Sequence, residues 1–190
     1  ITTTVAVGAY YGAANISENY WGGNAPVPGV YYTVEYTNNN VAVNDYYEEY
    51  SEGTLSNKVT LNNVAKAGKY YYESITAAFA AVQDGETVTM LDNVNLSESI
   101  KVNNKITLDL NGKTITGTDN ATVSFALFEV QPSKELTVKD ENNTGKITLT
   151  ATNNRGWNAY SSVISNQRGK LTVNGGTIEH LGGTDMAYAI

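Results

Sequence analysis

The sequence of 190 residues contains no cysteine and a single histidine, His180. Without cysteine the chain can form no disulfide bond and has no thiol nucleophile. One histidine cannot make the His/Cys cluster that binds a transition metal. We therefore expect stability to come from packing and hydrogen bonds, and we expect no cofactor. Ca²⁺ alone stays open as a ligand, and no Ca²⁺-binding motif supports it.

Positive charge is also scarce. The chain has 12 basic and 19 acidic residues, a net charge of -7, and its only arginines are Arg155 and Arg168. Proteins that bind nucleic acid cluster Lys and Arg against the phosphates, so nucleic acid is not an expected partner. Charged residues make up only 16% of the sequence, whereas Asn, Thr, Gly and Tyr are frequent. This composition is typical of an exported β protein.

Long apolar runs are missing as well. No stretch of about 18 apolar residues is present, so we expect no membrane-spanning segment. The chain starts at Ile1 without the basic and apolar regions of a secretion signal, which would place such a signal or a wall anchor outside this sequence. From composition we predict an extracellular location, either secreted or at the cell surface.

What the sequence does have is a short strand phrase that recurs in different surroundings. It is present as Ile106-Thr107-Leu108, Leu136-Thr137-Val138 and Leu171-Thr172-Val173, with spacings of 30 and 35 residues. Because alternate residues of a strand point to opposite faces, the apolar side chains should share one face and the threonines the other.

Each phrase belongs to a set of three strand-like segments. A second strand follows it across an Asn/Gly turn, at 114–116, 147–149 and 177–178, and a third precedes it, at 99–102, 123–130 and 162–165. Repeats of strands and turns indicate a β-solenoid or a propeller. Since the repeats differ in length mainly in their turns, we predict an all-β solenoid. The alternative is a series of β-hairpins, which Asn-Gly turns also favour.

One segment departs from the β pattern. Residues 74–83 combine Ser74 as an N-cap with Ile75, Phe79 and Val82 on one helical face, and Gly85 follows the segment. We predict a short helix that covers the open end of the solenoid before its first coil. The alternative is a helix that lies on a sheet face. The preceding tyrosines, residues 70–72, are expected to brace this cap.

The first 60 residues have a different character. They are rich in tyrosine and contain Trp21, Pro26 and Pro28. We predict a boundary between Gly53 and Val64.

Two stretches resemble a known family. Asn19-Tyr20-Trp21-Gly22-Gly23, followed by Pro26, resembles a phrase near the end of pectate-lyase-like β-helix modules. Residues 72–115, which include Asp84-Gly85-Glu86-Thr87-Val88 and Leu108-Asp109-Leu110-Asn111-Gly112, resemble the opening of such modules in adhesin-like surface proteins of gut Gram-positive bacteria. The resemblance implies a right-handed parallel β-helix with one short N-terminal capping α-helix.

The order of the two stretches implies two modules. Residues 1–60 would be the C-terminal end of a preceding β-helix module, with a Tyr/Trp-rich closing segment. Residues 61–190 would be the cap helix and first rungs of the next module, truncated at the C-terminus. Neighbouring β-helix modules of the same polypeptide are then the expected partners. The alternative is one compact domain in which the Tyr-rich start packs against the later coils.

Enzymes that share this fold include polysaccharide lyases and hydrolases, as the resemblance implies. A lyase needs an Arg or Lys base beside Ca²⁺-binding carboxylates, and an inverting hydrolase needs two carboxylates roughly 6.5 to 9.5 Å apart. The candidate catalytic residues are Asp109, Asp140 and Glu179, which follow or lie near the recurrent strand phrase and could line one side of the solenoid. No adjacent Asp pair and no Arg-centred motif accompanies them, so we favour a chain that is not an enzyme.

Tyrosine is the other candidate for function. Tyr46, Tyr47 and Tyr50 could form a glycan-binding patch, because aromatic faces stack on sugar rings. The favoured alternative is that a set of aromatic residues plugs the end of a coil at a module junction: Tyr20, Trp21, Tyr31 and Tyr32. His180 is expected to be a turn residue.

Together these features favour a non-enzymatic structural or adhesive module of an extracellular bacterial surface protein, part of a multi-module stalk or filament. Beyond neighbouring modules, expected partners are host or microbial glycans or surface proteins. The alternative is a carbohydrate-active or carbohydrate-binding β-helix.

Overall fold

The computed structural model describes residues 14–15, 19–20, 41–43, 45–51, 54–152, 159–182 and 186–190. Strands predominate in this part of the chain, and the helix is short.

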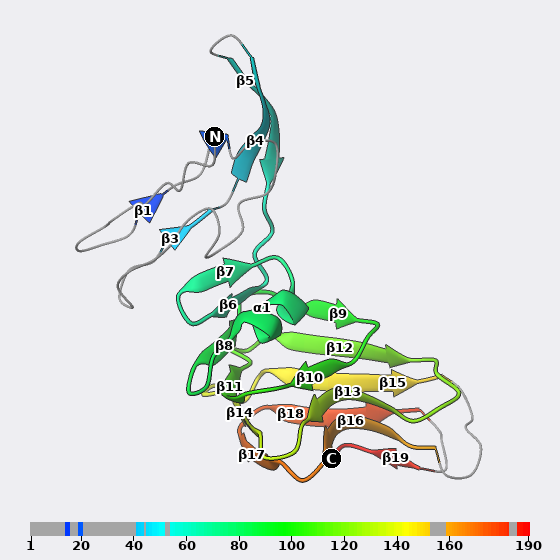
Figure 1. Cartoon of the computed structure of the whole chain (residues 1–190). Helices are drawn as coiled ribbons and strands as arrows, with labels where there is room; N and C mark the ends of the chain where they lie inside the picture. The colour runs from blue at the N-terminus through cyan, green and yellow to red at the C-terminus, as the bar shows by residue number, and fades with distance from the viewer. Residues whose placement is uncertain are drawn as a thin grey trace.

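The described strands between Thr87 and Tyr188 form four successive coils of three strands each (Figure 1). Equivalent strands of successive coils pair in parallel, which builds three sheets along the axis of the coil. The coils are β8 (Thr87–Met90), β9 (Val94–Leu96) and β10 (Ile100–Val102); β11 (Lys105–Asp109), β12 (Thr114–Asp119) and β13 (Phe125–Val130); β14 (Glu135–Lys139), β15 (Lys146–Ala151) and β16 (Ser161–Asn166); and β17 (Lys170–Asn174), β18 (Thr177–Leu181) and β19 (Ala187–Tyr188). The fold is the predicted parallel β-helix, and the hairpin alternative is wrong for these coils.

The recurrent strand phrase sets the register of the largest sheet. Ile106 pairs with Leu136 and Leu136 with Leu171, so the sequence spacings of 30 and 35 residues are the lengths of two coils. Thr107, Thr137 and Thr172 stack in the adjacent column, as predicted.

The inward-facing residues form one continuous apolar core. Leu108, Leu136, Val138, Ile147 and Leu149 have no exposed surface. Burying a side chain of this size contributes about 1.5–3 kcal/mol, so each complete coil adds several such increments. The coil is therefore held by its interior, in keeping with the absence of disulfides.

The predicted helix is present as α1, Ile75–Ala81. The Ser74 hydroxyl accepts a hydrogen bond from Ala77 N–H at 3.5 Å, and the helix ends at Val82 because the backbone there is extended. Phe79 packs against Phe128 of β13, with 5.6 Å between ring centroids. The helix thus covers the interior at the first-coil end, as expected (Figure 1).

A hairpin that the sequence did not predict lies beside this cap. Strands β6 (Ala65–Ala67) and β7 (Tyr70–Tyr72) pair antiparallel, and β6 also pairs antiparallel with β8. The three tyrosines therefore form a strand that extends the sheet beyond the first coil. Tyr72 packs against the core, and its burial raises the pKa of the hydroxyl.

The described residues before position 60 also contain parallel pairs. Strands β1 (Ala14–Asn15) and β3 (Val41–Ala42) pair in parallel, as do β2 (Asn19–Tyr20) and β4 (Asp45–Ser51). Both pairs have the same offset, since 41 − 14 and 46 − 19 are each 27 residues. Strand β4 then forms an antiparallel hairpin with β5 (Thr54–Thr60). Trp21, Pro26 and Pro28 lie outside the described residues, and the predicted domain boundary stays a prediction.

Candidate functional site

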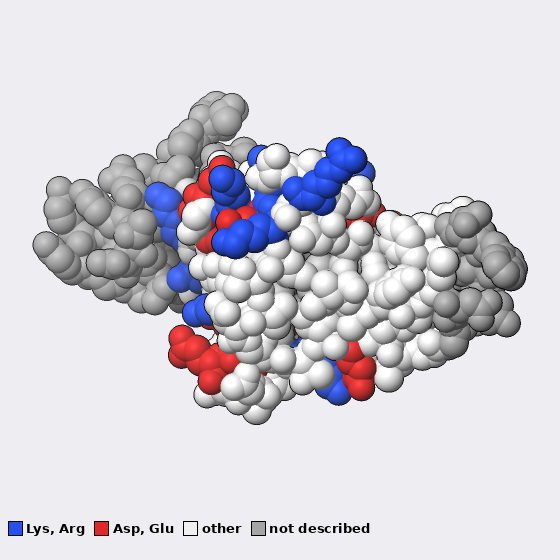
Figure 2. All heavy atoms as spheres, turned by 90° about the horizontal axis from the view of Figure 1, so that it is seen from below, with Lys and Arg blue, Asp and Glu red and all other residues white. Residues whose placement is uncertain are grey.

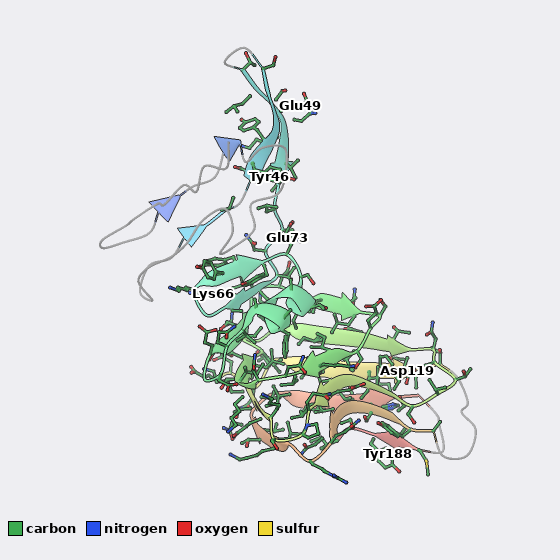
Figure 3. All side chains as sticks on the ribbon, viewed as in Figure 1. Tyr46, Glu49, Lys66, Glu73, Asp119 and Tyr188 are labelled. Carbon is green, nitrogen blue, oxygen red and sulfur yellow. The ribbon has the colours of Figure 1, made fainter. Side chains whose placement is uncertain are left out.

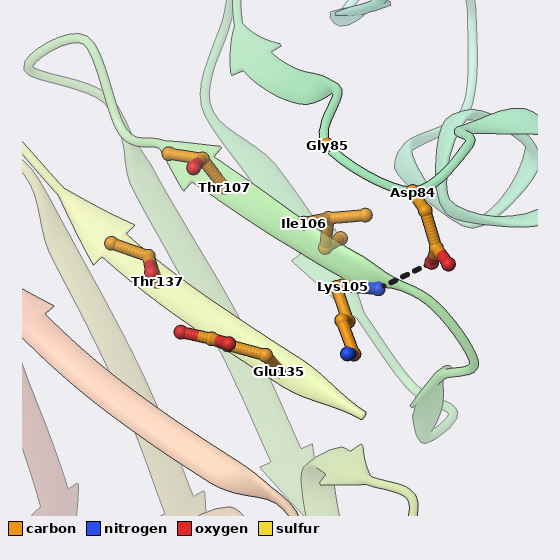
Figure 4. Close-up of a pocket in the computed structure, with 7 residues that line it drawn as sticks. All are labelled: Asp84, Gly85, Lys105, Ile106, Thr107, Glu135 and Thr137. Carbon is orange, nitrogen blue, oxygen red and sulfur yellow. Dashed lines mark hydrogen bonds between the residues drawn. The ribbon is translucent and has the colours of Figure 1, made fainter. Parts of the chain in front are cut away.

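The outer face of the six-stranded sheet carries a shallow depression of about 380 Å³ (Figure 4). Its lining is mixed in charge and includes two threonine hydroxyls: Asp84, Gly85, Lys105, Ile106, Thr107, Glu135 and Thr137. The Asp84–Gly85 turn forms one wall because Asp84 Oδ1 accepts a hydrogen bond from Lys105 N–H at 2.8 Å. Gly85 N–H donates to the carbonyl of Lys105 at 2.7 Å, which fixes this turn against β11.

Charged side chains beside the depression alternate in sign from coil to coil. Lys105, Glu135 and Lys170 stack in register, and Lys170 Nζ lies 2.5 Å from Glu135 Oε1. At the other end of the same strands, Lys139 Nζ lies 3.1 Å from Asp109 Oδ2. These ion pairs link neighbouring coils on the outer face.

Asp109 changes the proton affinity of Lys139. Its hydrogen bond and its charge raise the Lys139 pKa above the ordinary value for lysine. Because the pKa of Lys139 is higher in the folded than in the unfolded chain, the ion pair stabilises the fold at pH values below the ordinary lysine pKa. This stabilisation is lost as the pH rises through the folded-state pKa of Lys139. Asp109 is thus engaged in a contact between coils.

We expect Asp109→Asn to lower the pKa of Lys139 toward the ordinary value for lysine. The measurement is an NMR titration of the Lys139 side chain from pH 8 to 12. Glu141→Gln is the matched control and should have a smaller effect, because Glu141 is 3.6 Å away and largely exposed. An unchanged Lys139 pKa in Asp109→Asn would contradict the pairing.

Asp140, the second catalytic candidate, is only 1% exposed and holds a turn together. Its two carboxylate oxygens accept hydrogen bonds from Gly112 N–H at 2.9 Å and Gly145 N–H at 2.6 Å. These donors lie in the turns of two successive coils. A carboxylate so enclosed has no open side toward a polysaccharide.

Glu179, the third candidate, lies on a different sheet. It belongs to β18 of the four-stranded sheet β18-β15-β12-β9, and its carboxylate lies 3.0 Å from Lys146 Nζ. Asp109 belongs to the six-stranded sheet and Asp140 to a turn. The structure therefore does not bring the three predicted catalytic carboxylates into one groove.

A polar cluster that the sequence did not reveal joins Asp119, Ser161 and His180. Ser161 Oγ donates to Asp119 Oδ2 at 2.6 Å, and His180 Nε2 lies 2.8 Å from the same hydroxyl. Asp119 ends β12 at the loop end of the coils (Figure 3), and His180 lies within β18, so the expectation of a turn residue is wrong.

The order of this cluster differs from that of a catalytic triad. A serine hydroxyl has one proton, and Ser161 gives it to Asp119, so His180 Nε2 must be the donor in the second hydrogen bond. A general base would instead accept the serine proton. Ser161 also has no exposed surface. The cluster connects two sheets and does not present a nucleophile.

Of the predicted tyrosine patch, the structure describes the side chains of Tyr46 and Tyr47, which lie on opposite faces of β4. Tyr46 is 6% exposed, Tyr47 is half-buried, and successive residues of β4 point to opposite sides. The side chain of Tyr50 lies outside the described residues. Tyr46, on the hairpin that extends from the coils (Figure 3), is thus not available for stacking on a sugar.

Neither a metal centre nor a membrane helix was found in the part of the chain that the structure describes. No group of three or more His, Asp or Glu residues there could hold a metal ion. Its helix is too short to cross a bilayer.

Comparison with protein-family models, curated proteins and solved structures gave no match.

Proposed function

We propose that the chain is a non-enzymatic structural or adhesive module of an extracellular bacterial surface protein, part of a multi-module stalk or filament. The observation that carries this proposal is that all three candidate catalytic carboxylates form contacts between coils. Asp109 and Glu179 each form an ion pair with a lysine of a neighbouring coil, and Asp140 joins two turns. Each of the three serves coil-to-coil contact.

The pairing of strands β1 to β4 supports a multi-module chain. Two parallel strand pairs with the same 27-residue offset are what one turn of a solenoid would produce. They precede the helix that covers the first coil of the next unit. This order agrees with the two stretches of the sequence that resemble pectate-lyase-like modules, since residues 19–26 resemble the end of such a module and residues 72–115 resemble the opening of the next.

The test is incubation of the purified chain with a panel of polysaccharides, with and without Ca²⁺. We expect neither new reducing ends nor unsaturated products. A β-helix polysaccharide lyase assayed in parallel shows that the panel can report turnover. Cleavage by the chain that is lost on Asp109→Asn would overturn the proposal.

Glycan binding without turnover is the second candidate function. It is favoured by the depression on the six-stranded sheet, where the hydroxyls of Thr107 and Thr137 lie beside Lys105 and Glu135. We expect glycan-array hits to be lost in Thr107→Val/Thr137→Val and kept in Thr116→Val, which alters a threonine on another sheet. An array without hits would contradict this candidate.

A further inference from the structure

The hairpin of β4 and β5 has an exposed outer edge. Strand β5 ends the sheet β2-β4-β5 and, among the described residues, pairs on one side only, with β4. All its side chains are exposed except that of Val59, which is half-buried. The hairpin extends away from the coils, so they do not cover this edge (Figure 1). Because alternate residues of β5 bond to β4, the residues between them direct N–H and C=O groups outward and can accept a further strand.

The sequence of β5 matches itself in reverse order. Residues 54–60, TLSNKVT, have Asn57 at the centre, a polar residue on each side of it, an apolar residue next and threonine at both ends. An antiparallel copy with Asn57 opposite Asn57 places Leu55 opposite Val59. The same register places Thr54 opposite Thr60. Apolar pairs and Thr–Thr pairs that lie directly opposite each other stabilise antiparallel sheets.

The pairing also continues an apolar row that the hairpin begins. Val59 pairs with Tyr46 inside the hairpin, and Tyr46 is buried. Leu55 is 39% exposed. In the antiparallel pair, Leu55 of the second copy lies on the open side of Val59, which removes apolar surface of both residues from water. Two-fold symmetry repeats this contact, as in other interfaces between identical chains.

Asn57 determines the register. Its φ is +55°, a left-handed conformation that asparagine adopts more readily than most residues. Pairing with β4 is regular on both sides of it, at residues 54–56 and 58–60. When Asn57 lies opposite Asn57, the two irregular positions coincide and the three residues on each side remain paired. A shifted register would set Asn57 against a regular strand residue and would separate Leu55 from Val59.

Electrostatic repulsion between copies is limited, although the net charge is -7. Figure 2 shows basic and acidic side chains next to one another around a broad uncharged area, so that face of the coils carries no large patch of one sign. On the hairpin, Lys58 Nζ lies 3.1 Å from Asp45 Oδ2. Lys58 of a second copy would lie opposite Ser56, whose hydroxyl donates to Glu49 at 3.0 Å. Opposite charges therefore share one row across the pair.

We propose that β5 pairs antiparallel with β5 of a second copy of the chain, with the two-fold axis at Asn57. The pairing joins two three-stranded sheets edge to edge. The contact is small, because only seven residues of each copy form it, so the isolated chains form a weak dimer. Chains that carry several such hairpins would bind side by side more tightly. The inference goes beyond the proposed function and does not depend on it.

Disulfide trapping tests the register, since the chain has no cysteine of its own. Ser56 lies opposite Lys58 of the second copy, so Ser56→Cys is mixed with Lys58→Cys under mild oxidation. We expect at least about ten-fold more linked dimer in the mixture than in either variant alone. Identical positions lie diagonally across the pair, about 7–8 Å apart, which is too far for a disulfide without backbone movement. The readout is electrophoresis without reducing agent.

Leu55→Asp, introduced into both cysteine variants, tests the apolar row. We expect it to lower the yield of linked dimer at least about ten-fold, because a carboxylate would be buried against Val59. Val123→Asp is the matched control. Val123 is another exposed apolar residue, in the turn between β12 and β13, and its replacement should leave the yield unchanged.

Sedimentation of the unmodified chain gives an independent readout. Between about 10 µM and 0.5 mM we expect a reversible monomer–dimer equilibrium, which Leu55→Asp shifts to monomer. Circular dichroism of Leu55→Asp should match that of the unmodified chain, because Leu55 lies on the hairpin and outside the core of the coils.

Three results would overturn the inference. They are equal linkage in the mixture and in the single variants, a linked dimer that persists in Leu55→Asp, and an unmodified chain that stays monomeric over the whole concentration range. Polysaccharide cleavage would refute the proposed function and leave all of these readouts unchanged.

Discussion

Replacement of Phe79 by alanine is expected to lower the free energy of unfolding by about 3–5 kcal/mol, the usual cost of deleting a buried aromatic side chain. Phe79 is 5% exposed and packs against Phe128 of the second coil. Its removal leaves a cavity between α1 and the coils and opens the first-coil interior to water. The stability of the whole β-helix thus depends on a side chain outside it.

Urea unfolding followed by circular dichroism measures this effect. Thr76→Ala is the matched control, since Thr76 is an exposed residue of the same helix and its replacement should change stability by less than about 0.5 kcal/mol. A loss below about 1 kcal/mol in Phe79→Ala would mean that the helix does not seal the core.

Replacement of Asp140 by alanine is expected to cost about 3–5 kcal/mol. The substitution removes the carboxylate together with the two hydrogen bonds that it accepts, so the N–H groups of Gly112 and Gly145 lose this acceptor. Bonds to charged groups contribute roughly 1.5–3 kcal/mol each, and a buried unsatisfied donor is costly. Asp140→Asn should lose an intermediate amount, because one of its two side-chain atoms is a donor and cannot accept.

The same urea titration tests Asp140. Glu141→Ala is the control, because Glu141 is the next residue and its side chain is largely exposed. We expect it to change stability by less than about 0.5 kcal/mol. Equal losses in Asp140→Ala and Glu141→Ala would show that the turn does not depend on the buried carboxylate.

Much of the fold could be predicted from local patterns. The alternation of apolar residues and threonine in Leu136-Thr137-Val138 and its two counterparts indicates which side chains face inward. Because the three segments share this pattern, they pair in register in successive coils. The cap helix could be predicted because Ser74 and the Ile75, Phe79 and Val82 face are signals within one short segment.

The polar cluster of Asp119, Ser161 and His180 could not be predicted in the same way, because it depends on which coils meet. Asp119, Ser161 and His180 are 42 and 19 residues apart in sequence, and turn lengths bring them together. The β6–β7 hairpin was missed for a related reason. Tyr70–Tyr72 forms a strand because the edge of β8 is there to pair with, through β6.

Sequence by itself determined the repeat, the inward and outward faces of its strands and the helix at its start, since each follows from the chemistry of a few consecutive residues. Only the tertiary structure decided the roles of the charged residues. Asp109, Asp140 and Glu179 look alike in sequence, yet the first and third bind lysines of adjacent coils and the second is enclosed by backbone amides. The physical reason is that a carboxylate takes its role from neighbours about one coil away along the chain.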